Sequence, residues 1–115
     1  MVFEAGGRVS PLLTAGTGKI GLRVSGHPVP CLLVESLGAP ITGTSANISD
    51  RPPCRHAEEV LKALGEDVNL VLDGGETPGE AASTVLDVTV DPPRILREGL
   101  IRRKELEAII PVHAS

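Results

Sequence analysis

Aromatic residues are almost absent from this chain, which has one phenylalanine, Phe3, and no tryptophan or tyrosine among its 115 residues. Proteins that hold unpaired bases stack them on aromatic rings, so the sequence lacks the usual platform for single-stranded nucleic acid. An excess of positive charge is also missing, since 15 acidic side chains stand against 11 basic ones and the formal net charge is −4. No global field draws the chain onto a polyanion, and any nucleotide site must therefore be local.

Long hydrophobic runs are missing as well. The longest, such as Ala108–Val112, extend over only a few residues, whereas a membrane-spanning helix needs about 20. The segment from Met1 to Arg8 lacks the basic start and the long apolar middle of a secretory signal. We therefore expect a cytoplasmic protein with no membrane partner.

Cysteine is scarce, with only Cys31 and Cys54 in the chain. Two thiols this far apart predict neither a disulfide framework nor a four-thiolate zinc site, and they favour reduced, structural thiols. His27 lies four residues before Cys31 and His56 two residues after Cys54, which would supply four metal ligands if the two segments met. This spacing is much weaker than that of established zinc motifs, so we predict no metal site.

What the sequence does contain is an alternation of strand and helix patterns. Strands are expected at 2–5, 19–24, 40–44, 69–73, 83–90 and 94–97, and helices at 28–37, 57–64 and 103–110. Apolar and polar residues alternate within 19–24, which puts one face of that strand in the core and leaves the other to Lys19 and Arg23. The 28–37 helix is expected to be short and buried. The pattern predicts a single domain over residues 1–115, of the α/β or α+β class, with a mixed sheet.

The sharpest local signal is the run Thr42–Ser49, in which five hydroxyl or amide side chains surround a glycine before a proline-rich turn. Backbone amides in such a turn can surround a phosphate while hydroxyls complete the shell. The alternative is a turn whose polar groups satisfy its own backbone, and the pattern alone favours neither. Ser83 and Arg97 matter only if the fold brings them to this turn, because arginine binds phosphate and carboxylate through a two-pronged contact.

Five segments follow one another in a distinctive order. They are Gly21–Val24 with His27-Pro28, Thr44–Ser49, Leu72–Gly75, Ser83–Asp87 and Arg94–Gly99. In this order and with this spacing they resemble the C-terminal motifs of YrdC-like threonylcarbamoyl-AMP synthases, and the resemblance extends from about Val2 to Leu106. It implies a YrdC/RibB-like fold, in which a twisted mixed sheet is flanked by helices.

By this resemblance the chain would join L-threonine, bicarbonate and ATP into threonylcarbamoyl-AMP and release pyrophosphate, as a nucleotidyltransferase in tRNA processing. The product leads to the N6-threonylcarbamoyl group on adenosine 37 of tRNA. Mg²⁺ would accompany ATP as substrate, and no tightly bound cofactor is expected. No side chain is assigned a catalytic role, because the carbamate oxygen of the substrate attacks the α-phosphate and positioning supplies much of the rate. The resemblance assigns threonine binding to Arg23, Gly43 and Ser83, and ATP binding to Ser45, Asn47, Pro53, Arg97 and, more weakly, Lys19.

The sequence also departs from the family pattern. Family members carry an upstream Lys-x-Arg motif that contacts phosphates, and no segment of this sequence matches it. Asp50 stands where glycine is frequent and Pro53 where serine is frequent, and Asp50 brings a negative charge close to the expected phosphate site. We therefore expect a fragment of the family domain whose synthase activity is impaired.

Two other functions stay open at this point. One is a nucleotide or double-stranded RNA binding module without catalysis, since reading a duplex by its shape needs a basic patch but no aromatic rings. The other is a subunit whose exposed sheet edge pairs with a second chain, either a partner or another copy of itself, that supplies the missing strands.

Overall fold

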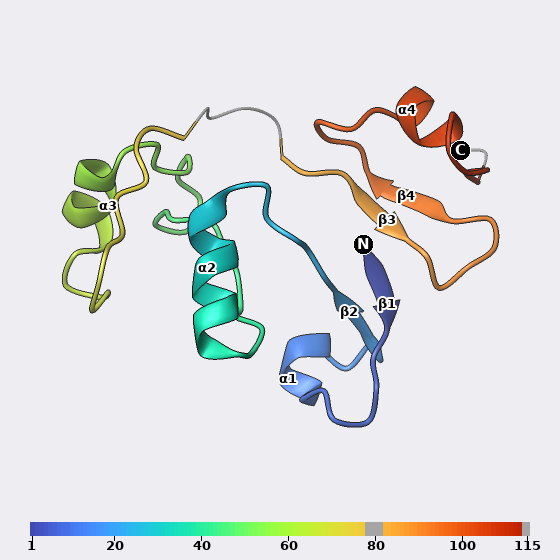
Figure 1. Ribbon diagram of the computed structural model, residues 1–115, viewed down its shortest axis with the longest axis horizontal. Coiled ribbons are helices and arrows are strands. Elements are labelled where there is room, and N and C mark those ends of the chain that lie inside the picture. Colours follow the sequence, from blue (N-terminus) through green and yellow to red (C-terminus); the bar gives the residue numbers. More distant parts are fainter. Residues whose placement is uncertain (78–81, 114–115) are drawn as a thin grey trace. The chain divides into compact units, whose positions relative to one another are not determined.

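The computed structural model describes residues 1–77 and 82–113 (Figure 1). The strands are β1 (Val2–Glu4), β2 (Lys19–Gly21), β3 (Val85–Asp87) and β4 (Arg94–Arg97), and the helices are α1 (Pro11–Thr14), α2 (Pro28–Leu37), α3 (Ala57–Leu64) and α4 (Arg103–Glu107). None of the helices in the described part of the chain has the length and apolar character that crossing a bilayer demands.

The four strands form one mixed sheet in the order β2-β1-β3-β4 (Figure 1). The outer pairs, β1 with β2 and β3 with β4, are antiparallel, whereas the central pair of β1 and β3 is parallel. This parallel pair joins the N-terminal and C-terminal parts of the sequence, because Val2 lies opposite Asp87. The predicted α+β class with a mixed sheet is confirmed.

Internal contacts divide the chain into two compact units. Unit 1 comprises Met1–Val24 and Glu80–Ser115 and contains the sheet with α1 and α4, and unit 2 comprises Ser25–Gly79 and contains α2 and α3. Unit 2 carries eight acidic and three basic side chains, whereas unit 1 carries seven acidic and eight basic ones. A polyanion therefore meets less repulsion on unit 1. The single domain expected over the whole chain stays a prediction.

Helix α2 begins and ends where its local sequence requires. The Nδ1 atom of His27 accepts a hydrogen bond from the N–H of Val29 at 3.3 Å, and Pro28 takes the first helical position, where no donor is needed. Gly38 ends the helix in the left-handed region, with a φ of 64°, and donates its N–H to carbonyls of the last turn. The predicted helix and its glycine end are confirmed, as is the helix predicted at 57–64.

Two of the predicted strands are absent from the sheet. Residues 40–44 and 69–73 are not paired as strands, and no backbone hydrogen bond within the described residues involves them. Their apolar residues favour a strand, but a strand forms only where a neighbour pairs its backbone groups, and these segments have no such neighbour. Ile41 and Leu70 are accordingly 46% and 75% exposed.

Other elements differ from prediction in length. Strand β2 ends at Gly21, although Leu22 still exchanges two backbone hydrogen bonds with Met1, each at 2.7 Å. Leu22 and Val24 are 50% and 91% exposed instead of facing a core. The strand expected at 83–90 is confined to β3, and the last helix ends at Glu107 rather than at 110. The sequence predicts no helix at 11–14, yet the hydroxyl of Ser10 accepts the N–H of Leu12 and begins α1 there.

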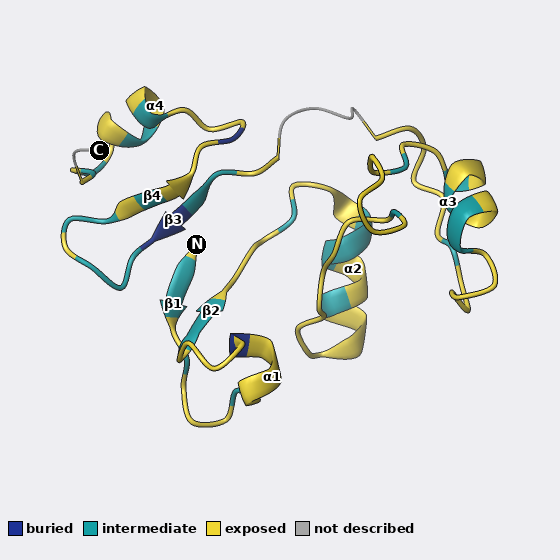
Figure 2. Cartoon of the chain, turned by 180° about the vertical axis from the view of Figure 1, so that it is seen from behind, coloured by how far each residue is buried: buried dark blue, intermediate teal, exposed yellow. Residues whose placement is uncertain are grey.

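Little apolar surface is buried. In the described residues Leu86 on β3, 6% exposed, is the one apolar side chain that is buried. The burial expected for α2 is wrong, since that helix buries no residue (Figure 2). Its Leu32 and Leu37 are 59% and 64% exposed. Exposed apolar side chains of this size leave surface that a further chain segment or partner can cover.

Candidate functional site

The hydroxyl-rich segment forms a closed turn in unit 2, between α2 and α3. The N–H of Cys54 donates to the carbonyl of Ala46 at 2.9 Å and closes the turn, and the N–H of Arg51 donates to the carbonyl of Ile48 at 3.0 Å within it. Asp50 adopts a φ of 64°, in the left-handed region that glycine enters without steric cost. The backbone thus explains why glycine suits this position. We call residues 45–54 the Ser45 turn.

Asn47 holds the Ser45 turn from inside. Its Nδ2 atom donates to the carbonyl of Ile48 at 2.9 Å and to that of Arg51 at 3.0 Å. Its Oδ1 atom is buried and has no hydrogen-bond partner in the described residues. Asn47 therefore satisfies the backbone of its own turn, which is one of the two readings that the sequence leaves open. Its predicted role at ATP stays a prediction.

The other predicted ligand residues of unit 2 are exposed. A Cβ atom at Gly43 would meet no atom within 4 Å, so the space beside this backbone is open. Ser45 is exposed and its hydroxyl has no partner within the described residues, and Pro53 is exposed as well. Arg51, to which the sequence analysis assigns no role, is the one basic side chain of the Ser45 turn. The turn thus offers a free hydroxyl and one cation, which are groups that an anion site uses.

Unit 1 brings two predicted residues together. The guanidinium of Arg97, at the end of β4, donates to the carbonyl of Ser83 through Nη2 at 2.9 Å and through Nε at 3.3 Å. Gly99 is buried beside them, and a Cβ atom there would lie 1.9 Å from the carbonyl oxygen of Ala82. Ser83, assigned to threonine, and Arg97, assigned to ATP, are therefore neighbours. No other residue can replace Gly99 beside them unless the backbone moves.

Lys19 is already engaged in an ion pair. Its Nζ lies 3.1 Å from Oδ2 of Asp87 and 2.6 Å from Oγ1 of Thr89. Thr89 donates both its N–H and its hydroxyl to Oδ1 of Asp87, at 2.9 and 2.7 Å. These two Thr89 bonds first, and Lys19 next, lower the pKa of Asp87 to about 2. Lys19 thus stabilises the sheet, and a nucleotide could use it only if this pair opened.

Acid should weaken unit 1 through Asp87. Its pKa is lowered from 3.8 to about 2, so the charged carboxylate stabilises the folded state above pH 3.8, and this contribution is lost as the pH falls toward 2. We expect the urea midpoint of unfolding to fall over this range more steeply for the unsubstituted chain than for Asp87→Asn. Glu4→Gln, which removes an exposed carboxylate of β1, is the control and should keep the steep dependence. Equal slopes for all three proteins would contradict the assignment.

Arg23 lies just beyond β2 and is exposed. Within the described residues its guanidinium has no ion pair, which leaves both of its prongs for a carboxylate. A Cβ atom at Gly21 would meet nothing within 4 Å, in agreement with the expectation that this missing side chain leaves room beside Arg23. The convergence of Arg23, Ser83 and Arg97 with the Ser45 turn on one cavity stays a prediction.

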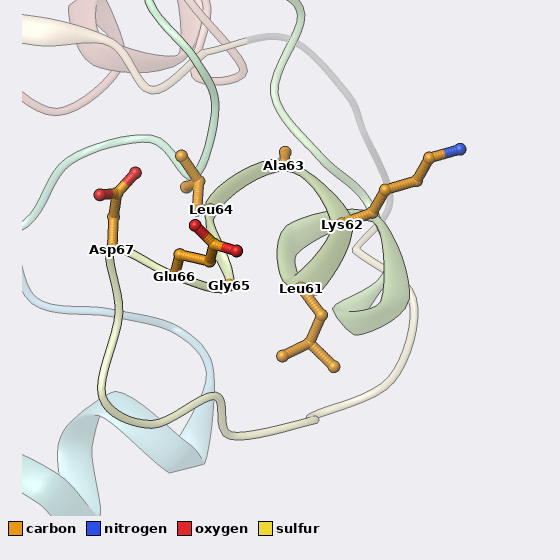
Figure 3. A pocket seen from close by; sticks show the side chains of 7 residues that line it. All are labelled: Leu61, Lys62, Ala63, Leu64, Gly65, Glu66 and Asp67. Carbon is orange, nitrogen blue, oxygen red and sulfur yellow. The ribbon is translucent and has the colours of Figure 1, made fainter.

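A hollow at the end of α3 is not this site. Its lining residues all come from one stretch of chain, Leu61–Asp67, at the end of α3 and just beyond it (Figure 3). Its volume is about 380 Å³. No predicted ligand residue lines it, and it includes the carboxylates of Glu66 and Asp67, which would repel phosphates.

The metal pattern weighed in the sequence consists of His27, Cys31, Cys54 and His56. The described residues contain no group of three or more His, Cys, Asp and Glu side chains that could hold a metal ion. Cys31 and Cys54 are both free, and the Sγ atom of Cys31 donates to the carbonyl of Ser25 at 3.3 Å.

The chain thus combines a short mixed sheet in unit 1, of the α+β class, with two helices in unit 2 that a polar turn separates. A family model for Sua5, YciO and YrdC, described as "Telomere recombination", matches residues 1–99. The chain belongs to the Sua5/YciO/YrdC family.

Known proteins of this family extend the comparison. The chain is 38% identical over 108 residues to the threonylcarbamoyl-AMP synthase of Bacillus subtilis, a match that covers 93% of this chain and 31% of that protein. Two solved structures of P. abyssi Sua5, one an alanine double variant and one complexed with L-threonine, are similar with TM-scores of 0.88 and 0.87 at 32% identity. Each covers 97% of this chain, which spans 35% and 34% of theirs. The predicted YrdC-like fold is confirmed.

Proposed function

We propose that this chain supplies threonine and ATP contacts for the synthesis of threonylcarbamoyl-AMP, in the cytoplasm, toward the modified adenosine 37 of tRNA. One observation carries the proposal: nearly the whole chain is similar to P. abyssi Sua5 complexed with L-threonine, with a TM-score of 0.87. Family membership and the threonylcarbamoyl-AMP synthase of B. subtilis support it further.

The reaction requires binding and orientation more than side-chain chemistry. The amine of threonine takes up bicarbonate with loss of water to give a carbamate. A carbamate oxygen then attacks the α-phosphate of ATP, the bond to the β-phosphate breaks, and pyrophosphate leaves. Holding the two reactants together supplies much of the rate, and cations near the phosphates stabilise the charge that develops there.

Each predicted residue has a role that its chemistry suits. Arg23 would hold the threonine carboxylate through its two prongs, with Ser83 beside it and the open backbone at Gly43 leaving room for the ligand. Arg97, already adjacent to Ser83, would face the phosphates. The Ser45 hydroxyl, Asn47 and Pro53 would surround the rest of the ATP molecule. Mg²⁺ would enter as the MgATP substrate, bound through the phosphates.

A second candidate is a subunit completed by another chain, and the unpaired segments 40–44 and 69–73 favour it. Their backbone groups lack partners in the described residues and their apolar side chains are exposed, as are those of α2. A strand from a partner, or from a second copy, would satisfy these groups by adding to them. In this reading the partner completes the reaction site, and the chain alone has little activity.

Pyrophosphate release tests the proposal. We expect the chain to release pyrophosphate from MgATP only when both L-threonine and bicarbonate are present, and slowly. Omission of either substrate serves as the control, and light scattering reports the oligomeric state. Binding of ATP or duplex RNA without any turnover would favour the binding module instead, and a chain that neither binds threonine nor releases pyrophosphate would contradict the proposal.

A further inference from the structure

Unit 2 is held together by polar contacts rather than by a core. No residue of α2 or α3 is buried, and the buried apolar residue of the described chain lies in unit 1. The start of α3 is nevertheless fixed to the segment that follows Gly75. Hydrogen bonds and ion pairs between residues 55–56 and 76–77 make this connection, which we call the Arg55–Glu76 latch.

The latch consists of several contacts of different kinds. The Nη2 atom of Arg55 lies 2.6 Å from Oε1 of Glu76, and its Nε donates to the carbonyl of Thr77 at 3.1 Å. The N–H of Thr77 donates in return to the carbonyl of Arg55 at 2.9 Å. His56 adds its Nε2 at 3.7 Å from the same Glu76 oxygen. Because the guanidinium donates through two of its nitrogens, Nε and Nη2, its orientation is fixed.

The latch bears directly on the Ser45 turn. Arg55 follows Cys54, whose N–H closes that turn on the carbonyl of Ala46 at 2.9 Å. On its other side the latch continues into Gly74, where a Cβ atom would lie 3.2 Å from Cε1 of His27, the residue that caps α2. The closing end of the turn is therefore tied to residues 76–77, and Gly74, two residues earlier, lies close to the His27 side chain at the beginning of α2.

We propose that Arg55 and Glu76 are positioning residues that hold the Ser45 turn in the geometry in which it binds the phosphates of ATP. This inference rests on the proposed function and assigns it two residues that contact neither substrate. Both side chains are about half exposed, so the pair is open to water and to salt. The pair contributes little to the free energy of unfolding. It lies, however, next to one end of the turn, where the N–H of Cys54 has a single hydrogen-bond partner.

Glu76→Gln tests the latch, because it removes the charge and keeps the shape. We expect the amide of Cys54 to exchange its hydrogen faster, and the dissociation constant for MgATP to rise by about two- to five-fold. Affinity for L-threonine and the urea midpoint should stay nearly unchanged, which a merely destabilising substitution would not allow. High salt should weaken MgATP binding by the unsubstituted chain toward the level of the variant.

Two further variants make the result decisive. Glu58→Gln removes an exposed carboxylate of α3 that has no ion pair in the described residues, and it should leave Cys54 exchange unchanged. The exchanged pair, Arg55→Glu with Glu76→Arg, should restore part of the slow exchange, because it forms the ion pair again but not the bond from Arg55 to the Thr77 carbonyl. If Glu76→Gln changes neither exchange nor MgATP affinity, the latch has no positioning role. If neither the unsubstituted chain nor any variant binds MgATP, but Glu76→Gln still speeds the exchange of the Cys54 amide, the proposed function fails while the tie between residues 55–56 and 76–77 stands.

Discussion

Replacing Gly99 with alanine is expected to destabilise the chain by about 3 kcal/mol and to separate Arg97 from Ser83. An added Cβ atom would lie 1.9 Å from the carbonyl oxygen of Ala82 and 2.7 Å from the nitrogen of Thr84. Both are backbone atoms, so no side-chain rotation can relieve the clash, and residues 82–84 must move away from the end of β4. The bonds from the N–H of Gly99 to the Thr84 hydroxyl and from Arg97 to the Ser83 carbonyl would be lost together.

Urea unfolding followed by circular dichroism measures this destabilisation, and Gly6→Ala is the matched control. A Cβ atom at Gly6 would meet nothing within 4 Å, so that variant should unfold within about 0.5 kcal/mol of the unsubstituted chain. The Gly99→Ala chain should also bind L-threonine more weakly, since Ser83 would be displaced. A Gly99→Ala chain as stable as Gly6→Ala would show that the backbone here is looser than the structure describes.

Local signals in the sequence predict the ends of elements well. Pro28 and Gly38 set the limits of α2 because each acts on its own backbone, through a fixed φ at the start and a left-handed conformation at the end. The same is true of the polar turn, where Asn47 bonds to residues one and four positions away. Features decided by neighbours within a few residues are therefore visible in one sequence.

Features decided by distant partners are not visible in this way. Residues 40–44 and 69–73 have the composition of strands, but pairing depends on a neighbour that composition does not supply. The resemblance assigns Lys19 to the nucleotide, and nothing near Lys19 in the sequence predicts its ion pair with Asp87, which lies 68 residues away. The role of Gly99 likewise depends on the carbonyl of Ala82, which no local pattern relates to it.

The residues of the candidate site also differ in how far the sequence predicts them. The family resemblance assigns Ser83 and Arg97 to one site, and the hydrogen bonds from Arg97 to the Ser83 carbonyl make them neighbours in unit 1. The Arg55–Glu76 latch lies outside every motif, because neither residue has chemistry that stands out in its own segment. Only the contacts of the folded chain relate them, so the sequence offers no signal from which this pair could be predicted.

Substitution of Arg23 by alanine should lower the affinity for L-threonine more than any other substitution discussed. In the proposed function its guanidinium holds the amino acid's carboxylate, and a hydrogen bond between charged groups contributes enough for its loss to weaken binding by about 10- to 100-fold. The guanidinium is exposed and unpaired in the described residues, so its removal costs no internal contact and stability should not change. Calorimetric titration with L-threonine measures the affinity, and pyrophosphate release should require a correspondingly higher concentration of L-threonine.

Two variants separate charge from geometry at this position. Arg23→Lys keeps the charge but offers a single point of contact, so it should recover only part of the affinity if the carboxylate is bound by both prongs. Arg8→Ala removes an exposed arginine of the same unit and should leave threonine affinity unchanged. MgATP affinity should be nearly the same in all of these proteins, because Arg23 is assigned to the amino acid alone. If Arg23→Ala binds threonine as well as Arg8→Ala does, Arg23 does not hold the carboxylate; if the unsubstituted chain does not bind threonine at all, the proposed function itself fails.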